Sequence, residues 1–273
     1  FNQVKMKKTL LLIQFLHFAS LIAQNTEHKI YPSNFEVVNP IRKKTFNNEG
    51  QCKERKQGGN PQIINGYQVF NGAMDGNRQV DPQIAVGGGY VLHGTNSGLI
   101  IYDKKGNYIQ GVSQKCFNDG IDPKMFYDIH NKVFVFDLWW YYDKEKNKPV
   151  NISVSETSDP TAAWNTYPVS RKDEVDGGGI GYSKKWIGYS YPGGEENTFV
   201  LRMNEAKSGK PATIYHFKGS LGHPVFMQDA IDDLYFFSIE NGDFVIQKVT
   251  EDIEGKPYAV VVSRKPYQVE YMG

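Results

Sequence analysis

The sequence has few cysteines, almost no net charge and no apolar run long enough to span a bilayer. With two cysteines among 273 residues, at most one intrachain disulfide can form. A formal net charge of +1 with 22% charged residues gives no electrostatic reason to expect a nucleic-acid partner. The longest apolar stretch, Thr9–Ile22, is shorter than the roughly 20 residues that a membrane-spanning helix needs. The composition instead indicates a chain long enough to bury a sizeable core.

The common catalytic motifs are also missing. The chain has no Gly-x-Ser-x-Gly nucleophile elbow, no phosphate-binding loop and no Cys-x-x-Cys pair. No two histidines have metal-ligand spacing, so His93 and His130 are interpreted as packing residues. The triple glycines at 87–89 and 177–179 precede no helix, so they are turns and not dinucleotide-binding loops.

Short apolar runs separated by glycine, asparagine, aspartate and serine fill residues 81–112. This pattern is typical of strands joined by tight turns. The predicted strands are Ile84–Val86, Tyr90–His93, Leu99–Tyr102 and Tyr108–Val112. Four antiparallel strands in about thirty residues would form one small sheet.

The opening of this unit recurs along the chain. Asp81-Pro82 returns at Asp122-Pro123, a weaker copy opens at Asp176, and His223-Pro224 opens the last unit. Strands are predicted after these openings at 133–138, 186–191, 234–239 and 244–249. Four-stranded meanders of roughly 40 to 50 residues are the spacing of β-propeller blades. We therefore predict an all-β chain, a β-propeller of four-stranded antiparallel blades. A sandwich or jelly roll is the alternative, but it would not need the same opening in each unit.

The N-terminal segment has the pattern of a secretory signal peptide. Phe1–Lys5 precede Met6, Met6–Lys8 forms a positive region, and Thr9–Ile22 forms an apolar region that ends in small residues. Residues 1–24 are therefore predicted to direct export, with 1–5 as an upstream extension. The ending Leu21–Gln24 resembles export signals of Bacteroidetes, and no lipobox cysteine follows it.

Residues 25–60 are predicted to be an irregular polar leader and residues 61–273 the propeller. The absent initiating methionine and the stop in mid-pattern predict an incomplete reading frame with about four blades. A complete five-bladed ring that uses residues 60–80 is the alternative. Cys52 and Cys116 could pair in an exported protein and tie the leader to the end of the first blade. Two buried free thiols are the other interpretation.

Propeller geometry would bring the blade openings together at one mouth of the central channel. Asp81, Asp122, Asp176 and His223 would then place three carboxylates and an imidazole around that mouth. The three carboxylates are candidate ligands for Ca²⁺ and candidate catalytic groups for glycoside hydrolysis. Alternatively they only cap turns, since aspartate before proline starts many turns. No other cofactor is expected.

Two loops on the same face are rich in aromatic residues. Trp139–Tyr142 contains four consecutive rings, which cannot all face inward because side chains alternate along a strand. In the second loop, Tyr191 is followed by Glu195 and Glu196, either of which is a candidate proton donor. Exposed rings beside polar groups stack on and hydrogen-bond sugars. The candidate ligand-binding residues are Trp139, Trp140, Tyr141, Tyr142, Tyr191 and His223. Packing between blades is the alternative.

A family resemblance appears at Ser155–Trp164. With the Asp-Pro openings and the turn Tyr102–Gly106, this segment resembles exported bacterial β-propellers over Asp81–Val249. It is distantly similar to the Asp-box hairpin of sialidase-like propellers and to a Pro-to-Trp turn of five-bladed glycosidases. Its spacing is longer, however, and the glycines of both motifs are absent. The sialidase arginine triad is not matched by Arg78, Arg171, Arg202 and Arg264. The resemblance therefore implies a fold and names no enzyme.

These observations lead to three functional hypotheses. The first is an exported propeller that binds carbohydrate or a surface partner through its channel mouth and aromatic loops. The second is a polysaccharide-active glycoside hydrolase or lyase that uses the channel-mouth carboxylates. The third is a structural module of a larger adhesin. Whether the chain is an enzyme stays open at this point.

Overall fold

The computed structural model describes residues 28–43, 61–65, 67–69, 81–139, 149–171, 178–191 and 196–266. These residues are nearly all β, with the short helix α2 (Met203–Ser208) and the 3₁₀ turn η2 (Gln114–Phe117) as the helical elements among them. No helix within these ranges is long and apolar enough to cross a membrane. The predicted signal peptide lies outside the described residues.

The first sheet, called blade 1, confirms the strands predicted in residues 81–112. Its antiparallel strands are β5 (Gln83–Gly87), β6 (Tyr90–Thr95), β7 (Gly98–Asp103) and β8 (Tyr108–Ser113), paired in chain order. Asp103 fixes the turn between β7 and β8. Its Oδ1 accepts the backbone N–H groups of Lys105 and Asn107 at 2.8 and 2.9 Å. This is the local bonding for which aspartate is favoured in turns.

Three further meanders follow, one for each predicted unit. Blade 2 contains β9 (Ile121–Asp128), β10 (Val133–Trp139), β11 (Val150–Ser155) and β12 (Trp164–Val169). Blade 3 contains β13 (Gly179–Tyr182), β14 (Trp186–Ser190), β15 (Thr198–Arg202) and β16 (Ala212–Phe217). Blade 4 contains β17 (His223–Pro224), β18 (Leu234–Glu240), β19 (Asp243–Glu251) and β20 (Pro257–Pro266). The predicted fold class is therefore confirmed.

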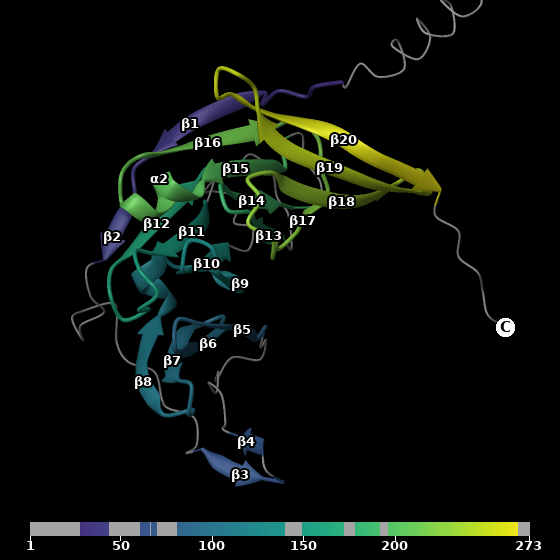
Figure 1. The fold of residues 1–273 in the computed structure, drawn as a ribbon. Helices are drawn as coiled ribbons and strands as arrows, with labels where there is room; N and C mark the ends of the chain where they lie inside the picture. The colour runs from purple at the N-terminus through teal and green to yellow at the C-terminus, as the bar shows by residue number, and fades with distance from the viewer. Residues whose placement is uncertain are drawn as a thin grey trace, which may run out of the picture.

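The four sheets follow one another along an arc and pack face to face (Figure 1). A separate cluster of buried apolar side chains fills each interface between neighbouring blades. Leu92 and Phe136 belong to the cluster between blades 1 and 2. Val135 and Ile187 belong to that between blades 2 and 3, and Val200 and Phe236 to that between blades 3 and 4. Because both faces of blades 2 and 3 are covered, β10, β11, β14 and β15 are continuously buried rather than alternating.

The prediction of an irregular leader was wrong for residues 34–38 and 41–43. The strand β1 (Asn34–Val38) pairs with β16, and β2 (Ile41–Lys43) pairs with β12. Just before them, Ile30 forms an antiparallel bridge with Ala259 in β20. Residues 30–43, here called the N-terminal strap, therefore cross the outer edges of blades 4, 3 and 2 in turn (Figure 1). Both edge strands are short and mostly exposed, and they belong to no repeated unit, which explains why no strand was predicted.

Two short strands precede blade 1 in the sequence. The strands β3 (Gln62–Ile64) and β4 (Tyr67–Val69) pair with each other as a two-stranded sheet.

Candidate functional site

The openings of blades 1 and 2 meet through the side chain of Asn96. This residue lies in the turn between β6 and β7 and is 5% exposed. Its Nδ2 donates to Asp81 Oδ2 at 3.1 Å, and its Oδ1 accepts the backbone N–H of Asp122 at 2.6 Å. The openings of blades 1 and 2 therefore lie side by side, and a mouth shared by all four openings stays a prediction. The bond partner of Asp81 is a side chain 15 residues away, so turn capping through backbone N–H groups also stays a prediction.

The structure describes only some of the residues that were predicted to bind Ca²⁺ or to catalyse glycoside hydrolysis. Asp176 and Glu195 lie outside them. Within the described ranges, no group of three or more histidine, cysteine, aspartate or glutamate side chains could hold a metal ion. Ca²⁺ binding and carboxylate catalysis at Asp81 and Asp122 therefore stay predictions.

A carboxyl group that the sequence reading missed lies between blades 2 and 3. Asp137 is fully buried in β10, where its Oδ1 accepts the backbone N–H of its cross-strand partner Lys124. Its Oδ2 has no hydrogen-bond partner within the described part of the chain. Burial raises the pKa of Asp137 to about 8, and the nearby charge of Asp122 acts in the same direction. Burial, followed by the charge of Asp137, also raises the pKa of Tyr189 in β14.

The sequence signal for Asp137 was a single charged residue within the apolar run Val133–Trp139. A charged residue in a strand buried on both faces is unusual, and such a group is either paired or neutralised by a shift in its pKa.

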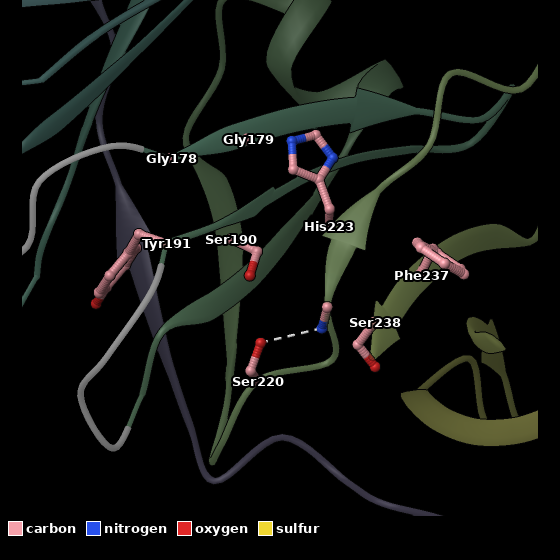
Figure 2. A pocket seen from close by; sticks show the side chains of 9 residues that line it. Gly178, Gly179, Ser190, Tyr191, Ser220, His223, Phe237 and Ser238 are labelled. Carbon is pink, nitrogen blue, oxygen red and sulfur yellow. Dashed lines mark hydrogen bonds between the residues drawn. The ribbon is translucent and has the colours of Figure 1, made fainter. Parts of the chain in front are cut away.

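A pocket of about 380 Å³ opens where blades 3 and 4 begin (Figure 2). The pocket, here called the channel-mouth pocket, lies at the starts of β13 and β17, the end of β14, and β18. It is lined by Gly178, Gly179, Ser190, Tyr191, Ser220, Gly222, His223, Phe237 and Ser238. It thus brings together Tyr191 and His223, two of the predicted ligand-binding residues.

The tautomer of His223 follows from its hydrogen bond. Nδ1 lies 2.9 Å from the carbonyl oxygen of Pro224, so in the neutral ring Nδ1 carries the proton and donates it. Nε2 is then a hydrogen-bond acceptor on an exposed ring. The ring packs against Gly179, where a Cβ would lie 2.1 Å from Nε2. Only glycine at 179 leaves the imidazole in this position.

The other side chains of the pocket offer hydroxyl groups and one aromatic ring. Ser220 Oγ accepts the backbone N–H of Gly222 at 3.1 Å, and Ser238 Oγ donates to Glu240 at 2.9 Å. The ring of Phe237 is 40% exposed. Among the described lining residues, none carries a formal charge when His223 is neutral. The pocket is suited to an uncharged ligand with hydroxyl groups and an apolar face.

Comparison with known proteins finds distant likenesses among solved structures. No protein-family model matches the chain, and no curated protein matches it. Among solved structures, TolB from Acinetobacter baumannii is 13% identical, with a TM-score of 0.36. The match covers 75% of this chain and 48% of the TolB chain, so this chain spans about half of that protein. A Bacteroidetes origin and a sialidase-like relationship find no support in these comparisons.

Trp139, a predicted ligand-binding residue, packs between blades instead. This side chain is 2% exposed and belongs to the apolar cluster between blades 2 and 3, with the Arg171 guanidinium 5.8 Å from its ring centre. It packs between blades because the odd-numbered residues of β10 face blade 3. Trp140, Tyr141 and Tyr142 lie outside the described residues. Tyr191 is 5% exposed, and its hydroxyl donates to the carbonyl oxygen of Glu196 at 2.8 Å.

The structure describes one of the two cysteines of the predicted disulfide. Cys116 is 1% exposed and disulfide-bonded, so it is not a free thiol. Cys52 lies outside the described residues, and its pairing with Cys116 stays a prediction.

Proposed function

We propose that this chain is an exported, carbohydrate-binding β-propeller whose channel-mouth pocket takes an uncharged sugar. The observation that carries the proposal is the joining of Phe237, His223 and serine hydroxyls in one pocket, with no charged side chain among the lining residues that the structure describes. A sugar ring has an apolar face that stacks on an aromatic ring and hydroxyl groups that donate and accept hydrogen bonds. The pocket volume of about 380 Å³ lies within the range of small-molecule sites.

The proposal gives a role to the Phe237 ring, the His223 ring and the serine hydroxyls of the pocket. The Phe237 ring would stack against the sugar face, and His223 Nε2 would accept a hydrogen bond from a sugar hydroxyl. Ser190, Ser220 and Ser238 would bond the remaining hydroxyls. Export follows from the predicted signal peptide, and the disulfide at Cys116 is compatible with an oxidising compartment.

Glycan-array screening followed by titration calorimetry on the whole chain tests the proposal. Neutral glycans are expected to bind, with affinity lowered about tenfold or more by Phe237→Ala and by His223→Ala. Ile239→Ala is the matched control, because Ile239 is 56% exposed, lies two residues further along β18 and is not a lining residue. The proposal is wrong if no neutral glycan binds, or if the pocket variants bind like the control.

The same glycans test the hydrolase alternative. Release of reducing ends that is abolished by Asp122→Asn would favour catalysis over simple binding. If glycans bind but are not cleaved, the hydrolase alternative is wrong and the chain is a binding protein.

A further inference from the structure

A second and larger hollow lies at the outer rim of blades 3 and 4. Its volume is about 680 Å³, and it is formed by the strap at residues 31–35, by β16 and by the turn before β20. This hollow, here called the outer groove, shares no lining residue with the channel-mouth pocket.

Aromatic rings form the walls of the outer groove. Tyr31 and Phe35 are 47% and 66% exposed, although most large aromatic side chains of the described residues are buried. Phe35 is the cross-strand partner of Tyr215, so their side chains lie on the same face of the sheet. Tyr31 and Phe35 lie at the two ends of segment 31–35, which bends at Ser33. Two exposed rings and Tyr215 along a hollow of about 680 Å³ give an extended ligand more than one ring to stack on.

The groove is held in shape before any ligand arrives. The backbone N–H of Ser33 donates to the carbonyl oxygen of His216 at 2.8 Å. The Tyr31 ring lies 5.8 Å from the ring of Tyr258, over which Lys29 Nζ sits at 4.4 Å. A preformed groove loses less conformational entropy on binding.

The charges around the groove are paired within the protein. Lys256 Nζ contacts Glu254 at 2.8 Å. Arg202 donates to the Tyr215 hydroxyl at 2.7 Å, and its guanidinium is also paired with Glu205 and Glu251. Lys256 is the one charged side chain among the described lining residues. Ser33, Asn34 and Thr213 provide the polar groups among the rings.

We propose that the outer groove is a second carbohydrate site, which binds an extended, neutral polysaccharide chain. This inference rests on the proposed carbohydrate-binding function but concerns different residues. Aromatic grooves also bind proline-rich peptides. The hydroxyl and amide groups between the rings favour the polysaccharide, and the peptide is an outcome of the test.

Affinity electrophoresis of the whole chain in gels with dextran, laminarin or xylan tests this site. The background variant His223→Ala/Phe237→Ala removes the proposed channel-mouth contacts. It is expected to keep measurable retardation, which adding Tyr31→Ala and Phe35→Ala should lower about fivefold or more. Phe35→Tyr keeps the ring and should retain binding. Ile84→Ala, in β5 and 65% exposed, controls for loss of an exposed apolar side chain.

Each outcome decides between the two proposals. Residual retardation lost only with the groove variants supports the second site. If the intact chain is retarded and the background variant is not, the groove inference fails while the proposed function stands. If no polysaccharide retards the intact chain, both fail. If an added polyproline peptide binds the groove in calorimetry and no polysaccharide does, the carbohydrate assignment of the groove is wrong.

Discussion

The imidazole of His223 packs against Gly179, the first residue of the neighbouring inner strand (Figure 2). A methyl group at 179 would overlap the ring, so Gly179→Ala should displace His223 without changing its chemistry. We expect glycan affinity to fall about tenfold, as in His223→Ala, because the Nε2 acceptor would leave its position. Titration calorimetry measures the affinity of each variant for the glycan.

The matched control is Gly94→Ala in β6, where the new methyl group would meet mainly the flexible end of Met125. This variant should bind as the wild type does. Thermal unfolding of both variants separates a local shift from a loss of folding. Unchanged affinity in folded Gly179→Ala would mean that the ring position is irrelevant.

The buried carboxyl of Asp137 predicts an unusual dependence of stability on pH. Its folded-state pKa is raised to about 8, whereas an unfolded aspartate titrates near about 3.9. Between these values the folded protein holds one proton more than the unfolded chain. This group therefore lowers the free energy of unfolding as pH rises from about 4 to 8. The full cost at pH 8 is on the order of 5 kcal/mol.

Asp137→Asn should remove this contribution. The amide keeps an oxygen that accepts the Lys124 N–H but carries no proton to lose, so the variant should match the wild type near pH 4 and exceed its stability at pH 8. Urea unfolding of both proteins across this range is the measurement. Parallel stability curves from pH 4 to 8 would show that Asp137 is not a neutral acid in the folded protein.

The Arg202 network predicts a large loss of stability from one substitution. Its guanidinium is paired with Glu205 and Glu251, donates to the Gly255 carbonyl oxygen, and stacks 5.2 Å from the Trp186 ring centre. Arg202→Ala leaves these partly buried acceptors unpaired and should lower the free energy of unfolding by about 2 to 4 kcal/mol.

Arg264→Ala is the control for Arg202, because Arg264 also pairs with two carboxylates but its side chain is 43% exposed. Water replaces such surface pairs, so this variant should unfold almost like the wild type. If both variants lost the same free energy of unfolding, the stabilising role assigned to the Arg202 network would be wrong.

The predicted Cys52–Cys116 disulfide gives a further stability test. The two positions are about 64 residues apart, and closing such a loop stabilises a fold by about 4 kcal/mol on the loop-entropy model. Cys52→Ser and Cys116→Ser should each lower the free energy of unfolding by a similar amount, and reduction should do so in the wild type. Peptide mapping without reductant should show the linked pair. An unlinked Cys52 would rule the pairing out.

The blades could be predicted because their signals are local. Apolar runs between turn residues located β5 to β8, and the recurring Asp-Pro opening located the start of blade 2. The strap could not be found in this way. Its strands pair with residues far along the chain, as Asn34 does with His216, and an edge strand has no strong apolar pattern.

The rim was predicted in outline, but its contacts were not. The repeat predicted that the openings of neighbouring blades lie close together, whereas the bonds of Asn96 to the openings of blades 1 and 2 depend on how these two blades stack. Similarly, the sequence left Trp139 open between ligand binding and packing between blades, and the facing of β10 toward blade 3 buries it. Nothing in the sequence separated Phe237 from the other apolar residues of its strand. Packing between the sheets decides which of these rings stays exposed and can line the pocket.

The most direct test of the channel-mouth pocket follows the His223 ring during titration with a neutral oligosaccharide found by the array. Long-range proton–nitrogen NMR spectra distinguish Nδ1 from Nε2 and report the acceptor directly. We predict that the Nε2 resonance shifts saturably with ligand while Nδ1 stays protonated. Glycan binding that leaves the His223 resonances unchanged would contradict the account, as would the failure of any neutral glycan to bind.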